Sequence, residues 1–193
     1  YGKPEPRTLG LSKVELHKNY ALVISTTGGL WRYLVGDTVQ FTSLNPYKIR
    51  ITGRIKHYMN AFGEEVIVDN TDKAIALACQ QTGAVVNDYT AAPLYFSAAQ
   101  NGAHEWLIEF ETAPADINRF AVVLDQALQS LNSDYEAKRY KNIALRLPVV
   151  QALPKGLFTE WLRSKGKLGG QHKVPRLSNE RNILEEIKLL WNP

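Results

Sequence analysis

Three features that define large classes of proteins are missing from this sequence. It contains one cysteine, Cys79, so an internal disulfide framework is excluded. No apolar run approaches the roughly 18 residues of a membrane-spanning helix, and no signal peptide is visible. No long run of like charges marks a nucleic-acid-binding arm, although the net charge is +4 at pH 7. We therefore expect a cytoplasmic protein that binds neither membranes nor nucleic acid.

Metal-binding and redox motifs are also missing. The four histidines have no spacing suited to a metal site, and there is no Cys-x-x-Cys motif. The glycine pattern of dinucleotide-binding loops is absent too. The segment Ser25–Gly29 is rich in hydroxyl groups and glycine, as phosphate loops are, but neither a lysine nor a helical pattern follows it closely. We interpret this segment as a hairpin turn.

What the sequence does contain is enough apolar material for a packed core. Of its 193 residues, 45% are hydrophobic and 22% are charged, as in ordinary globular chains. This length permits one large domain or two small ones. The chain begins with Tyr1 rather than Met, and residues 1–7 contain two prolines. We therefore expect a fragment of a longer polypeptide.

Residues 1–54 are predicted to be rich in β-strands. Short runs of aliphatic, aromatic and β-branched residues recur there between turn signals. The expected strands are Tyr20–Ser25, Trp31–Val35, Thr38–Thr42 and Tyr47–Thr52.

Residues 55–193 show a mixed pattern of strands and helices. Strand-like runs lie at 85–90, 94–98, 106–111 and 145–152. Helical spacing of apolar residues predicts helices over 71–82, 116–131, 135–140 and 158–164, and a last helix that Ser178 caps. This order predicts a compact α+β C-terminal domain, with a mainly antiparallel sheet and helices packed on one side of it. The fold class is therefore α+β, with a domain boundary between residues 54 and 55.

The dipeptide Gly36-Asp37 follows a strand-like run and is predicted to form a tight turn, because glycine tolerates backbone conformations that other residues avoid. A carboxylate at such a position can accept two hydrogen bonds from a vicinal diol such as a ribose. Arg54 adds a forked, permanently charged donor suited to ribose oxygens or phosphate. The alternative is that Asp37 only stabilises its turn.

The order of three motifs resembles a known group of enzymes. Trp31-Arg32-Tyr33-x-x-Gly36-Asp37 comes first, Gly53-Arg54 follows one strand later, and Gln171-His172-Lys173-Val174-Pro175-Arg176 comes late in the chain. The first two blocks resemble adenylate-forming enzymes. All three together resemble the acyl-acid amido synthetases of the auxin-responsive-promoter family, which contains plant hormone-conjugating enzymes and bacterial relatives. A bacterial member is an option that the sequence leaves open.

The resemblance implies an activity and a role for each matching residue. A carboxylic acid would be adenylated with ATP and Mg²⁺, and the acyl group would then be transferred to an amine such as an amino acid. Asp37 would hold the ribose hydroxyls with support from Arg54, and Tyr33 would line the nucleotide pocket. Lys56 would be the hinge between the domains, or an ordinary surface lysine. Lys173 would be the catalytic lysine.

Several alternatives stay open at this point. Arg176 could neutralise phosphate or pair with Glu180 at the start of the last helix. His172 replaces the aromatic residue that the family has before its lysine, and Trp31 replaces a tyrosine, so the plant substrates are not assumed. An acyl-CoA ligase of the same superfamily and a non-catalytic binding module are the alternative functions. The resemblance implies that the chain is the C-terminal portion of such an enzyme, with residues 1–54 as the β-rich end of its large domain and the phosphate loop upstream of Tyr1. We therefore expect the isolated 193-residue chain to be inactive.

Overall fold

The structure is a computed structural model that describes residues 7–55, 57–96, 101–142, 144–167, 169 and 172–191. The chain folds as two compact units, Tyr1–Lys56 and His57–Pro193. The hinge predicted at Lys56 lies outside the described residues.

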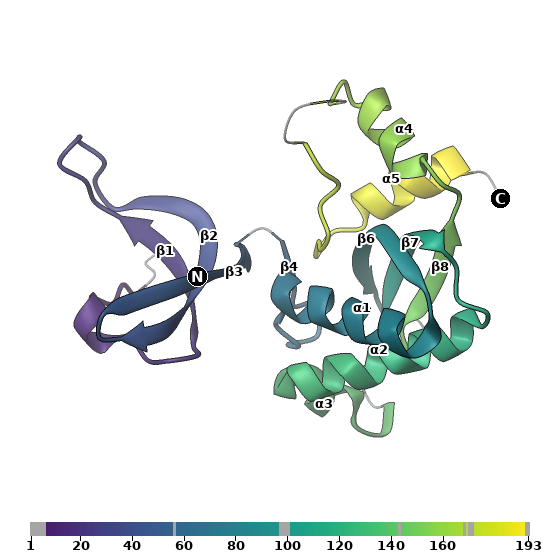
Figure 1. Cartoon of the computed structure of the whole chain (residues 1–193), viewed down its shortest axis with the longest axis horizontal. Helices are drawn as coiled ribbons and strands as arrows, with labels where there is room; N and C mark the ends of the chain where they lie inside the picture. The colour runs from purple at the N-terminus through teal and green to yellow at the C-terminus, as the bar shows by residue number, and fades with distance from the viewer. Residues whose placement is uncertain are drawn as a thin grey trace. The chain divides into compact units, whose positions relative to one another are not determined.

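The first unit is a three-stranded antiparallel sheet (Figure 1). A short 3-10 helix, η1 (Leu11–Lys13), precedes strands β1 (Asn19–Ile24), β2 (Tyr33–Leu44) and β3 (Tyr47–Arg54). Strand β2 is central because it pairs with both of its neighbours. The hairpin predicted at Ser25–Gly29 is confirmed, since Gly29 N donates to Thr26 O and Thr26 N donates to Leu30 O.

The tight turn predicted at Gly36 and Asp37 is wrong, because both residues lie inside the continuous strand β2. Leu34 is paired with Val23 and Thr38 with Ala21, so three residues of β2 face one residue of β1. This excess is a β-bulge, in which the φ angle of Gly36 is +94°. The glycine therefore bends the strand locally without reversing it, since β1 pairs with β2 on both sides of the bulge.

The second unit contains two small sheets and five α-helices within the described residues (Figure 1). Its strands are β4 (Tyr58–Met59), β5 (Val66–Ile67), β6 (Val85–Leu94), β7 (Ala103–Thr112) and β8 (Val149–Leu153). Its helices are α1 (Val68–Thr82), α2 (Ile117–Leu131), α3 (Ser133–Arg139), α4 (Leu157–Ser164) and α5 (Asn182–Trp191), with a short 3-10 turn η2 (Tyr140–Asn142) after α3. The α+β class is confirmed. The main sheet has the order β6-β7-β8, antiparallel between β6 and β7 and parallel between β7 and β8.

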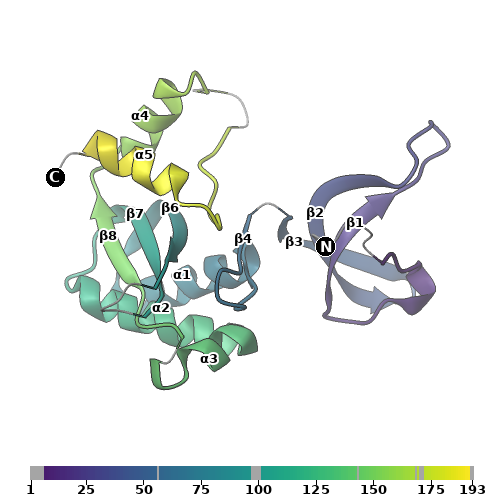
Figure 2. The ribbon, with the colours of Figure 1, turned by 180° about the vertical axis from the view of Figure 1, so that it is seen from behind.

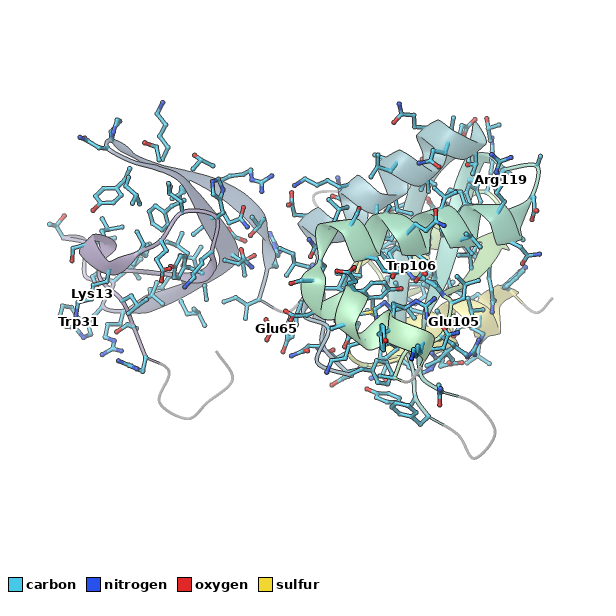
Figure 3. The ribbon with its side chains drawn as sticks, turned by 90° about the horizontal axis from the view of Figure 1, so that it is seen from below. Lys13, Trp31, Glu65, Glu105, Trp106 and Arg119 are labelled. Carbon is cyan, nitrogen blue, oxygen red and sulfur yellow. The ribbon has the colours of Figure 1, made fainter. Side chains whose placement is uncertain are left out.

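Helices cover both faces of this sheet, so the prediction of helices on one side is wrong. Helices α1 and α2 lie against one face, whereas α4 and α5 lie against the other, as Figures 1 and 2 show. The reason lies in β7, where Trp106 enters the core beneath α1 and α2 and Leu107 enters the core beneath α4 and α5. A strand that is apolar on both faces must be covered on both. Figure 3 labels Trp106 and its neighbour Glu105. The Glu105 carboxylate forms ion pairs with Arg181 and with Lys188 of α5.

Helix boundaries follow local signals in most places. Asp116 caps α2 by accepting hydrogen bonds from the N–H groups of Asn118 and Arg119, and Gly83 ends α1 with a φ angle of +71°. Helix α5 starts later than predicted, because Ser178 Oγ accepts from Glu180 N in a turn before the helix. None of the described helices has both the length and the apolar character needed to cross a membrane.

Candidate functional site

In the first unit, the sheet brings Asp37 and Arg54 together. They are opposite one another on β2 and β3, and Arg54 Nε lies 3.6 Å from Asp37 Oδ1. The Ile55 N–H donates to the Gly36 carbonyl at 2.9 Å, which fixes the end of β3 against the bulge. The side chain of Asp37 is 29% exposed and that of Arg54 is 70% exposed. A carboxylate acceptor and a guanidinium donor are thus presented side by side, a donor set that fits a ribose or phosphate group.

Tyr33 lies on the same strand as Asp37 but on the other side of the bulge. It is paired with Ile24 at the start of β2, and about half of its surface is exposed. The bulge at Gly36 therefore separates Tyr33 from the Asp37–Arg54 pair along the strand.

In the second unit, Lys173 is exposed but stands directly before a firmly anchored segment. Val174 is buried in the core beneath α4 and α5, and Leu177 is fully buried in the core beneath α1 and α2. The segment 174–178 therefore passes from one face of the main sheet to the other. No residue lies between the exposed lysine and the first buried anchor, since Val174 follows Lys173 directly.

Three hydrogen bonds, two of them between backbone groups, tie the same segment to the free edge of β6. Thr90 Oγ1 donates to Pro175 O at 2.7 Å, and Ala91 N donates to Arg176 O at 2.9 Å. The Ser178 N–H donates to Ala91 O at 3.1 Å. The segment is thus paired with β6 in parallel through Ala91 and Leu177, which makes it a short addition to the main sheet.

Arg176 pairs with an acidic residue that the sequence did not single out. Its Nη1 donates to both carboxylate oxygens of Asp72 on α1, at 2.5 and 2.6 Å. Its guanidinium carbon lies 5.2 Å from the centre of the Tyr89 ring, and its Nε lies 3.8 Å from Asp88 Oδ1. Of the two alternatives for Arg176, the pairing with Glu180 is therefore wrong. Arg176 reaches α1 because its backbone runs along the edge of β6, and α1 packs against one face of the sheet there.

Two cavities meet at Asp88 and Arg176. The smaller, of about 240 Å³, is lined by Lys173 and by other residues around it: Asn87, Asp88, Glu109, Phe158, Thr159, Leu162, His172, Val174 and Arg176. The larger, of about 470 Å³, lies between α1 and β6 and has Asp72 and Tyr89 in its wall. Burial raises the pKa of the Asp88 carboxyl, although the Tyr89 N–H and the charges of Arg176 and Lys173 favour its ionised form.

Glu109 lines the smaller cavity and caps α4. Its Oε1 accepts from Gly156 N at 2.7 Å and from Asn87 Nδ2 at 3.2 Å, and its Oε2 accepts from Phe158 N at 3.4 Å. A carboxylate at a helix N-terminus is stabilised by the free N–H groups there. The signal that could have indicated Asp88 and Glu109 is an acidic residue inside a strand-like run, since acids are rarely buried without partners.

The sequence predicted Lys173 and the Asp37–Arg54 pair but missed Asp72, Asp88, Tyr89 and Glu109. Asp72 had no local signal, because its partner Arg176 lies 104 positions further along the chain. Among the residues that the structure describes, no group of three or more His, Cys, Asp or Glu side chains could hold a metal ion.

Two family models match this chain. Residues 69–182 match the GH3 family C-terminal domain, and residues 2–54 match the GH3 family central domain. The indole-3-acetic acid-amido synthetase GH3.10 of Arabidopsis thaliana is 28% identical over 193 residues, covering 94% of this chain and 32% of that enzyme. The synthetase GH3.3 of the same plant is 28% identical over 188 residues, covering 91% of this chain and 31% of the enzyme. The chain thus spans about a third of the length of these relatives.

Solved structures show the same fold. The GH3.15 acyl acid amido synthetase superimposes with a TM-score of 0.71 at 19% sequence identity, over 94% of this chain and 35% of that one. The same enzyme in complex with 2,4-DB gives a TM-score of 0.69 at 20% identity, over 94% of this chain and 34% of that one.

Proposed function

This chain belongs to the GH3 family, and from that premise we propose that it is the C-terminal part of an ATP-dependent acyl-acid amido synthetase. The family membership that the three sequence motifs predicted is thereby confirmed. We propose further that residues 1–54 end the large domain and that residues 55–193 form the small C-terminal domain, with Lys56 as the hinge. The reaction would join a carboxylic acid to an amine such as an amino acid.

The Asp37–Arg54 pair supports the nucleotide-binding part of this proposal. A partly exposed carboxylate can accept hydrogen bonds from both hydroxyls of a ribose, and the neighbouring guanidinium can donate to a ribose oxygen or a phosphate. Tyr33, half-exposed on the same strand, would line the adenosine pocket. Mg²⁺ would be bound mainly through the phosphates of ATP, as this ion commonly is.

The position of Lys173 supports the catalytic part, and it is the observation that carries the proposal. An exposed ammonium group stands beside a segment that the main sheet and both cores hold in place. Such a group can stabilise negative charge as a carboxylate attacks the α-phosphorus and pyrophosphate leaves. In the second step the amine would attack the acyl carbon, and AMP would leave. Two steps replace one difficult displacement.

Exchange of radioactive pyrophosphate into ATP tests the first step. The full-length protein, offered a panel of carboxylic acids, is expected to catalyse exchange that depends on one or a few of these acids. The isolated 193-residue chain is expected to show none. A folded full-length protein that shows no exchange with any acid would contradict the proposed function. Exchange by the isolated 193-residue chain would contradict the expectation that the phosphate loop lies upstream of Tyr1. Formation of a thioester with coenzyme A, with no amide formed from amino acids, would favour an acyl-CoA ligase instead.

A further inference from the structure

The main sheet and both cores hold the segment that follows Lys173, and one side-chain contact adds to this anchoring. We propose that Asp72 and Arg176 are positioning residues for Lys173. The Asp72 carboxylate on α1 holds Arg176, and thereby the segment 174–178 that follows the lysine. The inference rests on the proposed role of Lys173. Neither Asp72 nor this ion pair is implied by the sequence motifs.

The geometry of the pair is that of a clamp. Both oxygens of Asp72 accept from Arg176 Nη1, and the Tyr89 hydroxyl donates to Asp72 Oδ1 at 2.6 Å. The Tyr89 ring lies under the guanidinium and is itself buried. The carboxylate is therefore held by a rigid strand residue, and it holds the arginine in turn. A lysine at position 176 could not reproduce all of these contacts, because its single nitrogen cannot face Asp72 and Asp88 separately while a planar group lies over the Tyr89 ring.

The clamp acts close to the catalytic group. Three residues of extended chain span at most about 11 Å, so the position of Arg176 limits where Lys173 can be. The same cluster also shapes the charge around the lysine. Asp88 lies near both cations, and it would be less well neutralised if Arg176 moved away. Loss of the clamp is therefore expected to loosen Lys173 without removing its charge.

Steady-state pyrophosphate exchange by the full-length protein tests this inference. Asp72→Asn is expected to lower kcat by roughly 10- to 100-fold, the scale of a misplaced catalytic group, and to change KM for ATP by no more than about twofold. Asp72→Glu keeps the carboxylate and is expected to retain most of the activity. Substitutions of Asp72, rather than of Arg176, test positioning, because Arg176 could also bind phosphate directly whereas a carboxylate could not. Glu111→Gln removes an exposed ion pair with Lys155 and is the matched control.

A double-mutant cycle separates positioning from a general structural role. If Asp72 acts through Lys173, Asp72→Asn has almost no further effect on kcat once Lys173→Ala has removed the ammonium group. If the reductions in kcat caused by Asp72→Asn and by Lys173→Ala multiplied in the double variant, the inference would be overturned. Val123→Ala, a truncation in the buried face of α2, is expected to lower stability and leave kcat per folded molecule unchanged. If Val123→Ala lowered kcat as much as Asp72→Asn does, the inference would also be overturned.

A second measurement does not depend on activity. Trypsin can cut the bond between Lys173 and Val174 only when the anchored segment opens locally. In native conditions, Asp72→Asn is expected to speed this one cleavage by roughly tenfold, whereas Glu111→Gln leaves it unchanged. An unchanged cleavage rate in Asp72→Asn would overturn the inference. A wild-type protein with no exchange activity would instead refute the proposed function, and the cleavage rates would still decide whether the clamp holds the loop.

Discussion

Glu64 Oε1 lies 3.0 Å from His104 Nε2, and both side chains are completely buried. The same carboxylate accepts hydrogen bonds from the N–H groups of Ala61 and Phe62, at 3.2 and 2.7 Å. Burial acts to raise the pKa of the Glu64 carboxyl, but the hydrogen bond and charge of His104 and the backbone N–H groups outweigh it, so the pKa is lowered. One buried carboxylate thus fixes the loop that joins β4 to β5.

This pair predicts a loss of stability in acid. Because the folded-state pKa of Glu64 is lowered from its ordinary value of 4.5, its stabilising effect is complete above that pH and is lost as the pH falls through the folded value. The slope is at most about 1.4 kcal/mol per pH unit for one proton. Urea unfolding of wild type and Glu64→Gln between pH 3 and 7 measures it. The difference in the free energy of unfolding between the two proteins should shrink below pH 4.5. A difference that stays constant with pH would contradict a lowered pKa for Glu64.

Gly36 predicts a purely conformational cost at the bulge. A Cβ added there would meet no atom within 4 Å, but the φ angle of +94° is unfavourable for any residue with a side chain. Gly36→Ala is therefore expected to destabilise the sheet by about 1–3 kcal/mol, the usual cost of such a conformation. Hydrogen exchange of the β2 and β3 amides measures the change. Gly10→Ala, at an open position with a φ angle of −76°, is the control and should leave exchange unaltered.

Asp37 is expected to contribute to nucleotide binding in the ground state and in the transition state alike. Removal of two charge-assisted hydrogen bonds by Asp37→Ala should cost about 2–4 kcal/mol in total. Calorimetric titration with ATP and exchange kinetics should both report this loss. Glu15→Gln removes an exposed acid that pairs with Lys18 in the same unit, and it should change neither quantity. Wild-type ATP affinity in folded Asp37→Ala would remove Asp37 from the proposed site.

Lys173 is expected to act mainly on charge that develops during adenylation. Lys173→Ala should reduce the turnover of pyrophosphate exchange by about 10²–10³, as the loss of one electrostatic stabiliser does. ATP affinity should hardly change, because an interaction made only in the transition state does not contribute to ground-state binding. Lys155→Ala removes another exposed lysine of the same unit and is the control. Exchange at the wild-type rate in folded Lys173→Ala would refute the catalytic role.

Local chemistry made much of this molecule predictable. Asp116 begins α2 and Gly83 ends α1 as expected, because capping depends on residues within one turn of the helix end. Asn45 and Pro46 likewise separate β2 from β3, as their turn propensity predicts. The ordered motifs around Asp37, Arg54 and Lys173 were sufficient to predict the family.

Tertiary contacts decided the rest. The sequence by itself determined most helix and strand positions, since these depend on near neighbours along the chain. The residues proposed for catalysis came from the resemblance of its motifs to a known family. Only the folded structure decided that Gly36 forms a bulge, that helices cover both faces of the main sheet, and that Arg176 meets Asp72. Each of these depends on which strand or helix lies beside a residue, and that neighbour comes from a distant part of the chain. The guanidinium of Arg176 has many possible acidic partners in the sequence. Asp72 becomes its partner because α1 and the segment 174–178 both pack against β6.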